Sequence, residues 1–278
     1  MPPSRFKTLL KTFARDLRAS VRLTADVRSR FRLSMDFVLS RLIHLVPRGW
    51  RNRVREVHLR GDIKIRYRLN KGDLHSIREI WFQEVYRLPF DGPSGVLLDL
   101  GANIGMTSVW LAKRFPFTQV IAVEPDPTNA ALVRQNLELN GIPGQVLEAA
   151  IGPKEGTARF DPSELSNLGR LSEDGSLLVP MINVETIIKK FAVPSFALIK
   201  IDIEGSEQDL FDGPTGWLTR TDAIIIEFHA PVDHFRITGV VSSHGFKHIP
   251  AHSLVPDNMD CFIRVVRTPT GNDANGDT

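Results

Sequence analysis

LLDLGANIG, residues 97–105, is an apolar run that ends in an acidic residue and two glycines. The strand-like part, VLLDLG, has no polar alternation, which is typical of a strand buried on both faces of a parallel sheet. Gly101 would let the backbone leave this strand sharply, and Gly105 would allow close approach at the start of a helix. The stretch therefore predicts a strand, a tight turn and a helix whose first N–H groups face a ligand.

Segments of strand and helix character alternate after this turn. The periodicity predicts strands at 96–101, 119–124, 145–150, 177–184, 196–202, 223–228, 246–250 and 261–266, and helices at 104–114, 128–139, 185–191, 206–212 and 235–244. Such alternation predicts an α/β fold with a doubly wound, mostly parallel sheet. The last two strands lie close together along the chain, so we expect an antiparallel hairpin at one edge.

The 278 residues are enough for one large domain with an appendage. We expect a basic helical arm over residues 1–55, and a strand pair with a helix over 56–94. The core domain should then span 95–268, before a disordered Asn/Gly/Asp-rich tail at 269–278.

The first 60 residues are strongly basic. They hold 15 Lys or Arg and 4 Asp or Glu, a net charge of +11, so the remainder carries 3 − 11 = −8. Apolar residues recur at helical spacing on one side of the arm, and most of the basic residues lie on the other side. The apolar positions are Phe6, Leu10, Phe13, Leu17 and Val21. Two interpretations remain equal: residues 1–45 contact an anionic membrane surface, or they pack on the chain's own domain or on a second subunit.

Composition limits the compartment and the partners. Cys261 is the single cysteine, which excludes a disulfide framework within one chain and indicates a reducing compartment. No apolar stretch approaches the roughly 20 residues of a spanning helix. We therefore expect a cytoplasmic protein, with peripheral contact at the inner face of a membrane as an alternative. Nucleic acid is disfavoured as a partner, because no RNA-binding signature is present.

The turn itself discriminates between cofactors. A dinucleotide turn needs a glycine where this chain has Asn103, and no lysine follows Gly105 to meet a phosphate. Asp99 is a poor neighbour for phosphates but a good partner for an ammonium group. Glu124, at the end of the next strand, can accept hydrogen bonds from ribose hydroxyls, as an acid does in NAD sites. Its alternative role is only structural, as an acid near the N-terminus of the helix that Asp126 caps. S-adenosylmethionine (SAM), with an amine, a ribose and no phosphate, fits this set best.

Four segments in this order resemble the FkbM-type SAM-dependent methyltransferases: LLDLGANIGMTSVWLAKRFP, VIAVEPDPTNAALVRQNLELNG, EAAIG and LIKIDIEGSEQDLFDG, within residues 95–230. The resemblance implies a class I, Rossmann-like methyltransferase fold, SAM as methyl donor, and a hydroxyl acceptor on a sugar, glycolipid or secondary metabolite. It also implies a cofactor site. The methionine and ribose side comprises Asp99, Gly101, Ala102, Asn103 and Gly105, the ribose-binding acid is Glu124 with Pro125 beside it, and Glu148, Ala149 and Ala150 lie beside the adenine.

Two strand ends offer groups for the chemistry, since an alcohol attacks a methyl group better when a base removes its proton. In KIDIEGSE, Lys200 and Asp202 share one face of the strand. We expect Asp202 beside the methyl group and Glu204 at the acceptor hydroxyls. Glu207 is interpreted only as an acid that favours the next helix N-terminus.

The second strand end, EFH, places Glu227 and His229 on one side of the strand. His229 is the natural base candidate near neutral pH, and a structural role is equally compatible with its position. Carboxylates at these ends could bind Mg²⁺. Nothing else in the chain completes an obvious metal set, so no metal is expected.

The sequence thus favours a SAM-dependent O-methyltransferase that acts on a glycan, glycolipid or small metabolite. Nitrogen methylation is disfavoured, because IDIEG is not the Asn/Asp-Pro-Pro-aromatic turn that usually accompanies it. Two alternatives stay open. One is an NAD(P)-dependent oxidoreductase, and the other is a non-catalytic scaffold whose arm binds lipid or nucleic acid.

Overall fold

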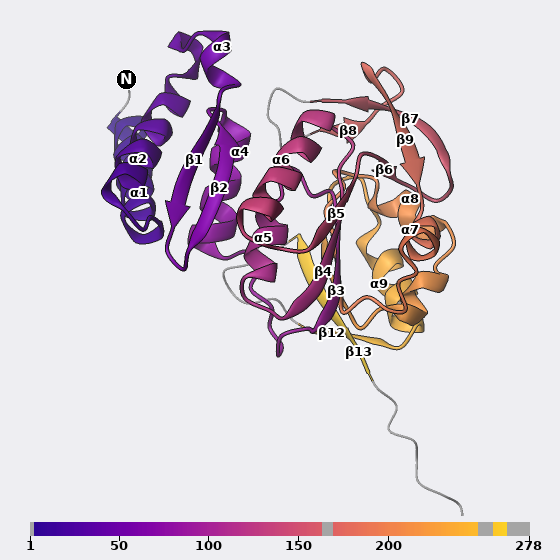
Figure 1. Cartoon of the computed structure of the whole chain (residues 1–278). Helices are drawn as coiled ribbons and strands as arrows, with labels where there is room; N and C mark the ends of the chain where they lie inside the picture. Colours follow the sequence, from indigo (N-terminus) through magenta and orange to yellow (C-terminus); the bar gives the residue numbers. More distant parts are fainter. Residues whose placement is uncertain (1–2, 163–168, 250–257, 266–278) are drawn as a thin grey trace, which may run out of the picture.

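The computed structural model describes residues 3–162, 169–249 and 258–265 and is built on a seven-stranded sheet (Figure 1). The strands are β3 (Gly95–Leu100), β4 (Phe117–Val123), β5 (Gly144–Leu147), β10 (Leu198–Ile201), β11 (Ala223–Glu227), β12 (Phe246–Ile249) and β13 (Met259–Arg264). Their order in space is β12-β13-β11-β10-β3-β4-β5. Only β13 runs antiparallel to its neighbours among these strands. The predicted doubly wound sheet with a late antiparallel edge hairpin is confirmed.

Helices cover both faces of this sheet. On one face lie α5 (Met106–Ala112) and α6 (Pro127–Leu139); on the other lie α7 (Val184–Phe191), α8 (Glu207–Asp212), η3 (Gly216–Arg220) and α9 (His234–Ser243) (Figure 1). Successive β3 residues point to opposite faces, so Leu97 joins the apolar cluster under α5 and α6, and Leu98 joins the one under α7 and α9. Burial on both faces explains why the strand reads as an uninterrupted apolar run.

An N-terminal layer packs outside α5 and α6 (Figure 1). It contains α1 (Pro3–Leu23), α2 (Val27–Arg41), η1 (Ile43–Leu45), α3 (Arg48–Arg51), the antiparallel pair β1 (Val54–Leu59) and β2 (Ile63–Arg68), α4 (Lys71–Ser76), and η2 (Ile77–Gln83), which is π-helical. Asn136 and Asn140 of α6 accept hydrogen bonds from the backbone N–H groups of Arg66 and Lys64 at 2.7 and 3.0 Å. These side chains satisfy backbone donors at the edge of β2 and join the layer to the core.

A second sheet was not anticipated. It contains β6 (Ala150–Ile151), β7 (Gly156–Asp161), β8 (Arg170–Leu171) and β9 (Leu177–Ile182), in the order β6-β9-β7-β8. The prediction of a single strand at 145–150 is wrong, because this segment contributes to β5 in the main sheet and to β6 in the second sheet. The strand expected at 177–184 is β9. The chain changes sheets at residues 148–149, and apolar periodicity alone does not reveal which sheet a strand joins. The predicted tail at 269–278 lies outside the described residues.

Candidate active site

A cavity opens at the carboxyl ends of β3, β4, β10 and β11, the edge where parallel sheets bind ligands. Its described lining contains nine of the residues that the sequence assigned to the site. They are Gly101, Ala102, Asn103, Glu124, Pro125, Ala149, Ala150, Asp202 and Glu204. The other four, Asp99, Gly105, Glu148 and His229, do not line it. Phe160, Arg170 and Leu171 add a wall from the second sheet.

The turn after β3 is tight because Gly101 and Gly105 adopt φ angles of +78° and +80°. A Cβ on Gly101 would lie 1.8 Å from the carbonyl oxygen of Asp202, so only glycine lets the turns after β3 and β10 meet. Gly105 lies behind the cavity, where an added Cβ would be 3.1 Å from the backbone of Val133 on α6. Both glycines therefore lie where two backbone segments approach each other too closely for a side chain.

Glu124 ends β4 and is buried. Its Oε2 accepts a hydrogen bond from the backbone N–H of Asn103 at 2.8 Å, and its Oε1 accepts one from Asp126 at 3.0 Å. Burial raises the pKa of Glu124 to about 8, although these hydrogen bonds lower it. Asn103 Oδ1 is buried with no hydrogen-bond partner among the described residues. Both residues line the cavity and carry buried acceptor oxygens, which suits a ligand with hydroxyl or ammonium groups.

Lys200 joins the two acids on either side of it. Its Nζ lies 3.1 Å from Asp99 and 3.2 Å from Asp202, and it donates a hydrogen bond to the carbonyl oxygen of Gly101 at 2.7 Å. Burial lowers the pKa of Lys200, but the Asp202 and Asp99 carboxylates outweigh burial and hold it above its usual value. Asp99 is fully buried and also accepts a hydrogen bond from Ser108. The ammonium group next to Asp99 is therefore that of Lys200.

Tyr86, beyond η2, reaches the site from the N-terminal layer. Its hydroxyl lies 3.1 Å from Asp202 Oδ2 and 3.2 Å from Glu227 Oε2. Burial and these carboxylates raise the pKa of Tyr86 well above its usual value, so the hydroxyl stays a donor. Sequence reasoning missed this residue, because 116 residues separate it from Asp202 and no motif links them.

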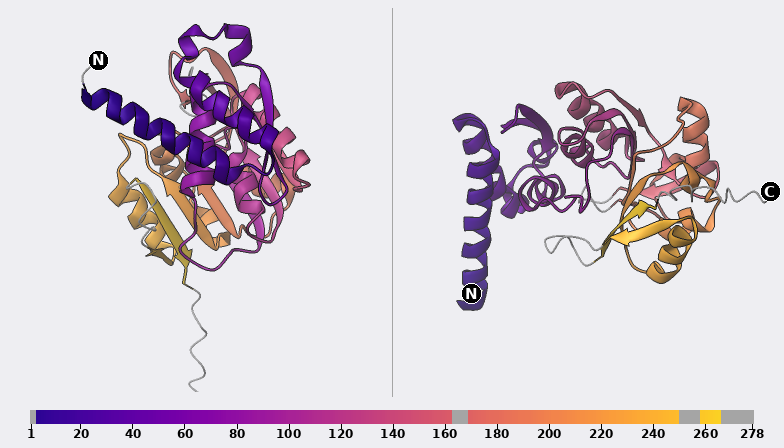
Figure 2. Two further views of the ribbon diagram at one scale, coloured as in Figure 1. Left: turned by 90° about the vertical axis from the view of Figure 1, so that its left-hand side faces the viewer. Right: turned by 90° about the horizontal axis from the view of Figure 1, so that it is seen from below.

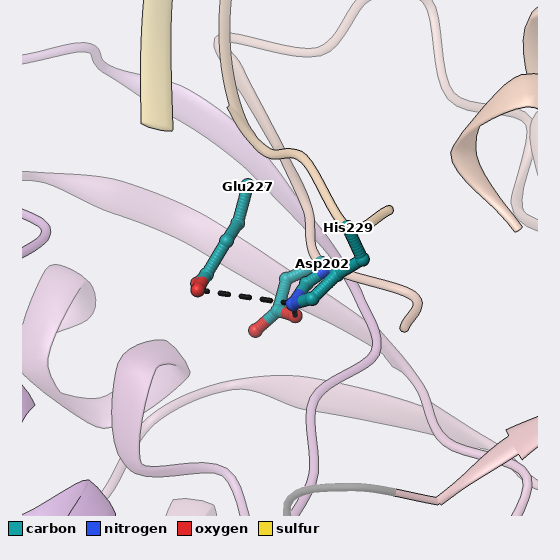
Figure 3. A group of neighbouring side chains, drawn as sticks. All are labelled: Asp202, Glu227 and His229. Atoms are coloured by element: carbon teal, nitrogen blue, oxygen red, sulfur yellow. Dashed lines mark ion pairs between the residues drawn. The ribbon is translucent and has the colours of Figure 1, made fainter. Parts of the chain in front are cut away.

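His229 lies among four carboxylates, and Figure 3 shows two of them, Asp202 and Glu227. Its Nδ1 is 3.0 Å from Glu207 Oε1, and its Nε2 is 3.9, 3.6 and 3.8 Å from Asp202, Glu204 and Glu227. Burial lowers the pKa of His229, but the hydrogen bond to Glu207 and the neighbouring acids raise it to about 9. Near neutral pH this imidazole already carries its proton, which leaves the carboxylates as proton acceptors.

The remaining acids differ in environment. Burial and the nearby Asp202 raise the pKa values of Glu204 and of Glu227 to about 7. Glu207 begins α8, as expected, but it is also fully buried and orients His229, a role that its sequence position did not indicate. Glu148 is exposed and pairs with Arg134 at 2.6 Å.

The model of a known protein family, the methyltransferase FkbM domain, matches residues 99–248, more than half of the chain. The hexuronic acid methyltransferase AglP of Haloferax volcanii is 29% identical over 182 residues, which cover 61% of this chain and 74% of AglP. The 2-O-methyltransferase NoeI of Sinorhizobium fredii is 30% identical over 157 residues, or 49% of this chain and 64% of NoeI. A solved structure of methyltransferase FkbM from Methylobacillus flagellatus has a TM-score of 0.44 at 17% identity and covers 92% of this chain and 60% of its own.

Proposed function

The chain belongs to the FkbM family of SAM-dependent methyltransferases, and from this premise we propose that it methylates a hydroxyl group of a sugar-containing acceptor. The observation that carries the proposal is the set of three carboxylates, Asp202, Glu204 and Glu227, that line the cavity beside the turn after β3. The names of two relatives, a hexuronic acid methyltransferase and a 2-O-methyltransferase, support a sugar hydroxyl. Family membership decides against the nicotinamide oxidoreductase and the non-catalytic scaffold.

The cavity suits a cofactor without phosphate. Arg170 and Lys200 are the basic residues among its described lining, and Lys200 is committed to Asp99 and Asp202. The ribose hydroxyls of SAM would donate to Glu124, and the ammonium group would donate to Asn103 Oδ1, which otherwise lacks a partner. The small side chains of Ala149 and Ala150 leave room for the adenine. Asp99 does not line the cavity. Its proposed role is to hold the ammonium group of Lys200, which does line it.

The reaction moves one methyl group and one proton. The S–CH₃ bond of SAM breaks as the O–CH₃ bond to the acceptor forms, and S-adenosylhomocysteine leaves. Glu204 receives the hydroxyl proton, because it lines the cavity and accepts no hydrogen bond from the described residues, whereas Asp202 and Glu227 are both held by Tyr86. Most of the acceleration comes from holding the hydroxyl oxygen in line with the methyl carbon.

The test is incubation with methyl-labelled SAM and two acceptor sets, oligosaccharides that contain a uronic acid and neutral oligosaccharides. We expect label on a sugar oxygen, located by mass spectrometry and by NMR of the product. Label on nitrogen or carbon, or on no member of either set, would contradict the proposal.

The ribose site predicts a pH dependence of binding. Only the ionised form of Glu124 accepts both ribose hydroxyls, and its pKa is about 8. The ionised fraction rises from about a tenth at pH 7 to about nine tenths at pH 9, so affinity should rise about tenfold over this range. Asp126 is the charged neighbour that contributes to this pKa. Calorimetry with methylthioadenosine measures the effect, since this ligand has the ribose but no titrating amino group.

The matched control for this titration is Glu124→Gln, which keeps the shape of the side chain and cannot ionise. Its affinity for methylthioadenosine should be lower than that of the wild type at pH 9 and should not change with pH. A pH dependence that persists in the variant would assign the titration to another group.

The N-terminal helix supports a second proposal, that the chain contacts an anionic membrane surface. In α1, Asp16, Ala19 and Ser20 are buried, and Asp16 pairs with Arg41 and Arg78. The apolar stripe therefore faces outward: Phe13, Leu17 and Val21 are 37%, 36% and 46% exposed, and α2 adds Phe31 at 68%. Figure 2 shows α1 along the outer side of the molecule, with its N-terminal end projecting beyond the body.

Exposed Arg15, Arg18 and Arg22 lie along the same helix, so the surface combines apolar and basic groups as an interfacial helix does. No helix in the described part of the chain is both long and apolar enough to cross a bilayer. This combination favours lipid over a second copy of the chain, because the first 60 residues would bring a net charge of +11 from each partner.

Cosedimentation with vesicles that contain phosphatidylserine tests the contact. The wild type should bind, and Leu17→Ser should weaken partition about tenfold through lost apolar burial. Leu178→Ser, which changes a leucine on β9 that is 70% exposed, should have no effect. A concentration-dependent dimer without vesicle binding would instead assign the surface to self-association.

A further inference from the structure

We propose that Asp202, Glu227 and His229 bind a divalent cation in the wall of the cavity. Each offers one ligand atom, and these atoms lie within 4.8 Å of one another (Figure 3). Asp202 and Glu227 also line the cavity, so a bound ion would be within reach of a molecule there. The sequence provided these side chains at two strand ends, β10 and β11, but not their convergence on one point.

The spacing of the ligand atoms suits a shared ion better than a direct contact. His229 Nε2 lies 3.9 Å from Asp202 Oδ1 and 3.8 Å from Glu227 Oε1, beyond the length of a hydrogen bond. Ligands bonded to one cation at about 2.1 Å lie about 3–4 Å apart. Small side-chain adjustments would bring the three atoms to these positions.

His229 is already oriented as a metal-ligating histidine. Glu207 Oε1 lies 3.0 Å from Nδ1, which leaves Nε2 directed toward the other carboxylates. A carboxylate on the second nitrogen typically fixes the ring and strengthens the ligand in metal sites. The other oxygen of Glu207, Oε2, is buried without a hydrogen-bond partner among the described residues. The negative charge of this fully buried acid is therefore only partly compensated by hydrogen bonds.

The local excess of carboxylates also favours a bound cation. Five carboxylates surround two bases here: Asp99, Asp202, Glu204, Glu207 and Glu227 against Lys200 and His229. With all groups ionised the excess is −3, and SAM, whose net charge is +1, reduces it only to −2. Buried charges in proteins are paired or coordinate metals. A divalent ion would displace the proton from His229 Nε2 as it binds, so binding would reduce the excess from −2 to −1.

The donor set indicates the kind of ion. Two carboxylates and one imidazole suit Mn²⁺ or a similar first-row ion, because carboxylates bind hard cations and imidazole binds borderline ones. Such an ion would supply Lewis acidity to an acceptor hydroxyl and lower its pKa. This catalytic role rests on the proposed function, whereas ion binding does not depend on it.

Titration of the full chain with Mn²⁺, followed by the electron paramagnetic resonance signal of the free ion, tests the site. We expect one saturable ion per chain. Glu227→Gln and His229→Gln should abolish it, and Glu207→Gln should weaken it by about 10- to 100-fold. Glu138→Gln, at an exposed acid on α6, should leave it unchanged. His248→Gln should too, although His248 and His234 flank Asp260 at a second place that could attract Mn²⁺.

Electron spin echo modulation from a bound imidazole nitrogen provides a readout in the wild type that needs no variant. No saturable binding up to about 1 mM Mn²⁺, no nitrogen modulation, or loss of binding only in His248→Gln would overturn the proposal. Binding of S-adenosylhomocysteine is measured in parallel. Retained Mn²⁺ binding without it would count against the proposed function and leave the ion site standing.

Discussion

Replacing Lys200 with methionine is expected to lower the free energy of unfolding by about 3–5 kcal/mol, because the change leaves a buried carboxylate pair without its cation. Lys200 is 2% exposed, and Asp99 is fully buried. The ammonium group also lies 5.9 Å from the centre of the Tyr86 ring. Methionine fills a similar volume, so the loss reflects charge rather than a cavity.

Urea denaturation measures this loss, with Lys189→Met, at an exposed position on α7, as the control. The double variant Lys200→Met with Asp99→Asn should recover part of the stability, because one of the two stranded charges is then removed. A loss below about 1 kcal/mol would mean that water or another cation reaches the two carboxylates.

Glu204→Gln is expected to slow methyl transfer by about 10²- to 10⁴-fold, the usual contribution of a general base. Glutamine keeps the length of the side chain. Glu204 has a φ of +52°, a left-handed conformation whose strain is similar for glutamate and glutamine. The backbone should therefore not change. Affinity for S-adenosylhomocysteine should stay the same, because the proposed mechanism has this acid contact the acceptor and not the cofactor.

The measurement is a single-turnover rate with whichever sugar acceptor the labelling experiment identifies, and Glu138→Gln serves as the control. An unchanged rate would assign the proton to Asp202 or Glu227. An equal loss of cofactor binding would show that Glu204 shapes the cofactor site instead.

The core of the fold was predictable because local chemistry and tertiary position agree there. β3 reads as an apolar run because both its faces are buried, and Gly101 is needed because any Cβ would collide with Asp202. Asp126 caps α6, with Pro127 in the first turn, as the sequence indicates. The four segments of the family resemblance lie along these same strand ends, so many of the residues that line the cavity followed from them.

The parts that escaped prediction depend on contacts between distant segments. Residues 145–150 read as one strand, QVLEAA, and nothing local marks the change from one sheet to the next. The role of Glu207 depends on His229, which lies 22 residues away on another loop. The arm shows the same limit: helical spacing predicted its apolar stripe, but the ion pairs of Asp16 decide that the opposite face packs inward.

The hydrogen bonds of Tyr86 also affect when the site can exist during synthesis. The N-terminal layer leaves the ribosome first, and Glu227 follows 141 residues later. The nascent chain can complete its outer layer before β11 emerges, but until then Tyr86 has at most one of its two carboxylate partners, Asp202. A chain released before Glu227 would thus carry the turn after β3 but only part of the carboxylate set that Tyr86 joins.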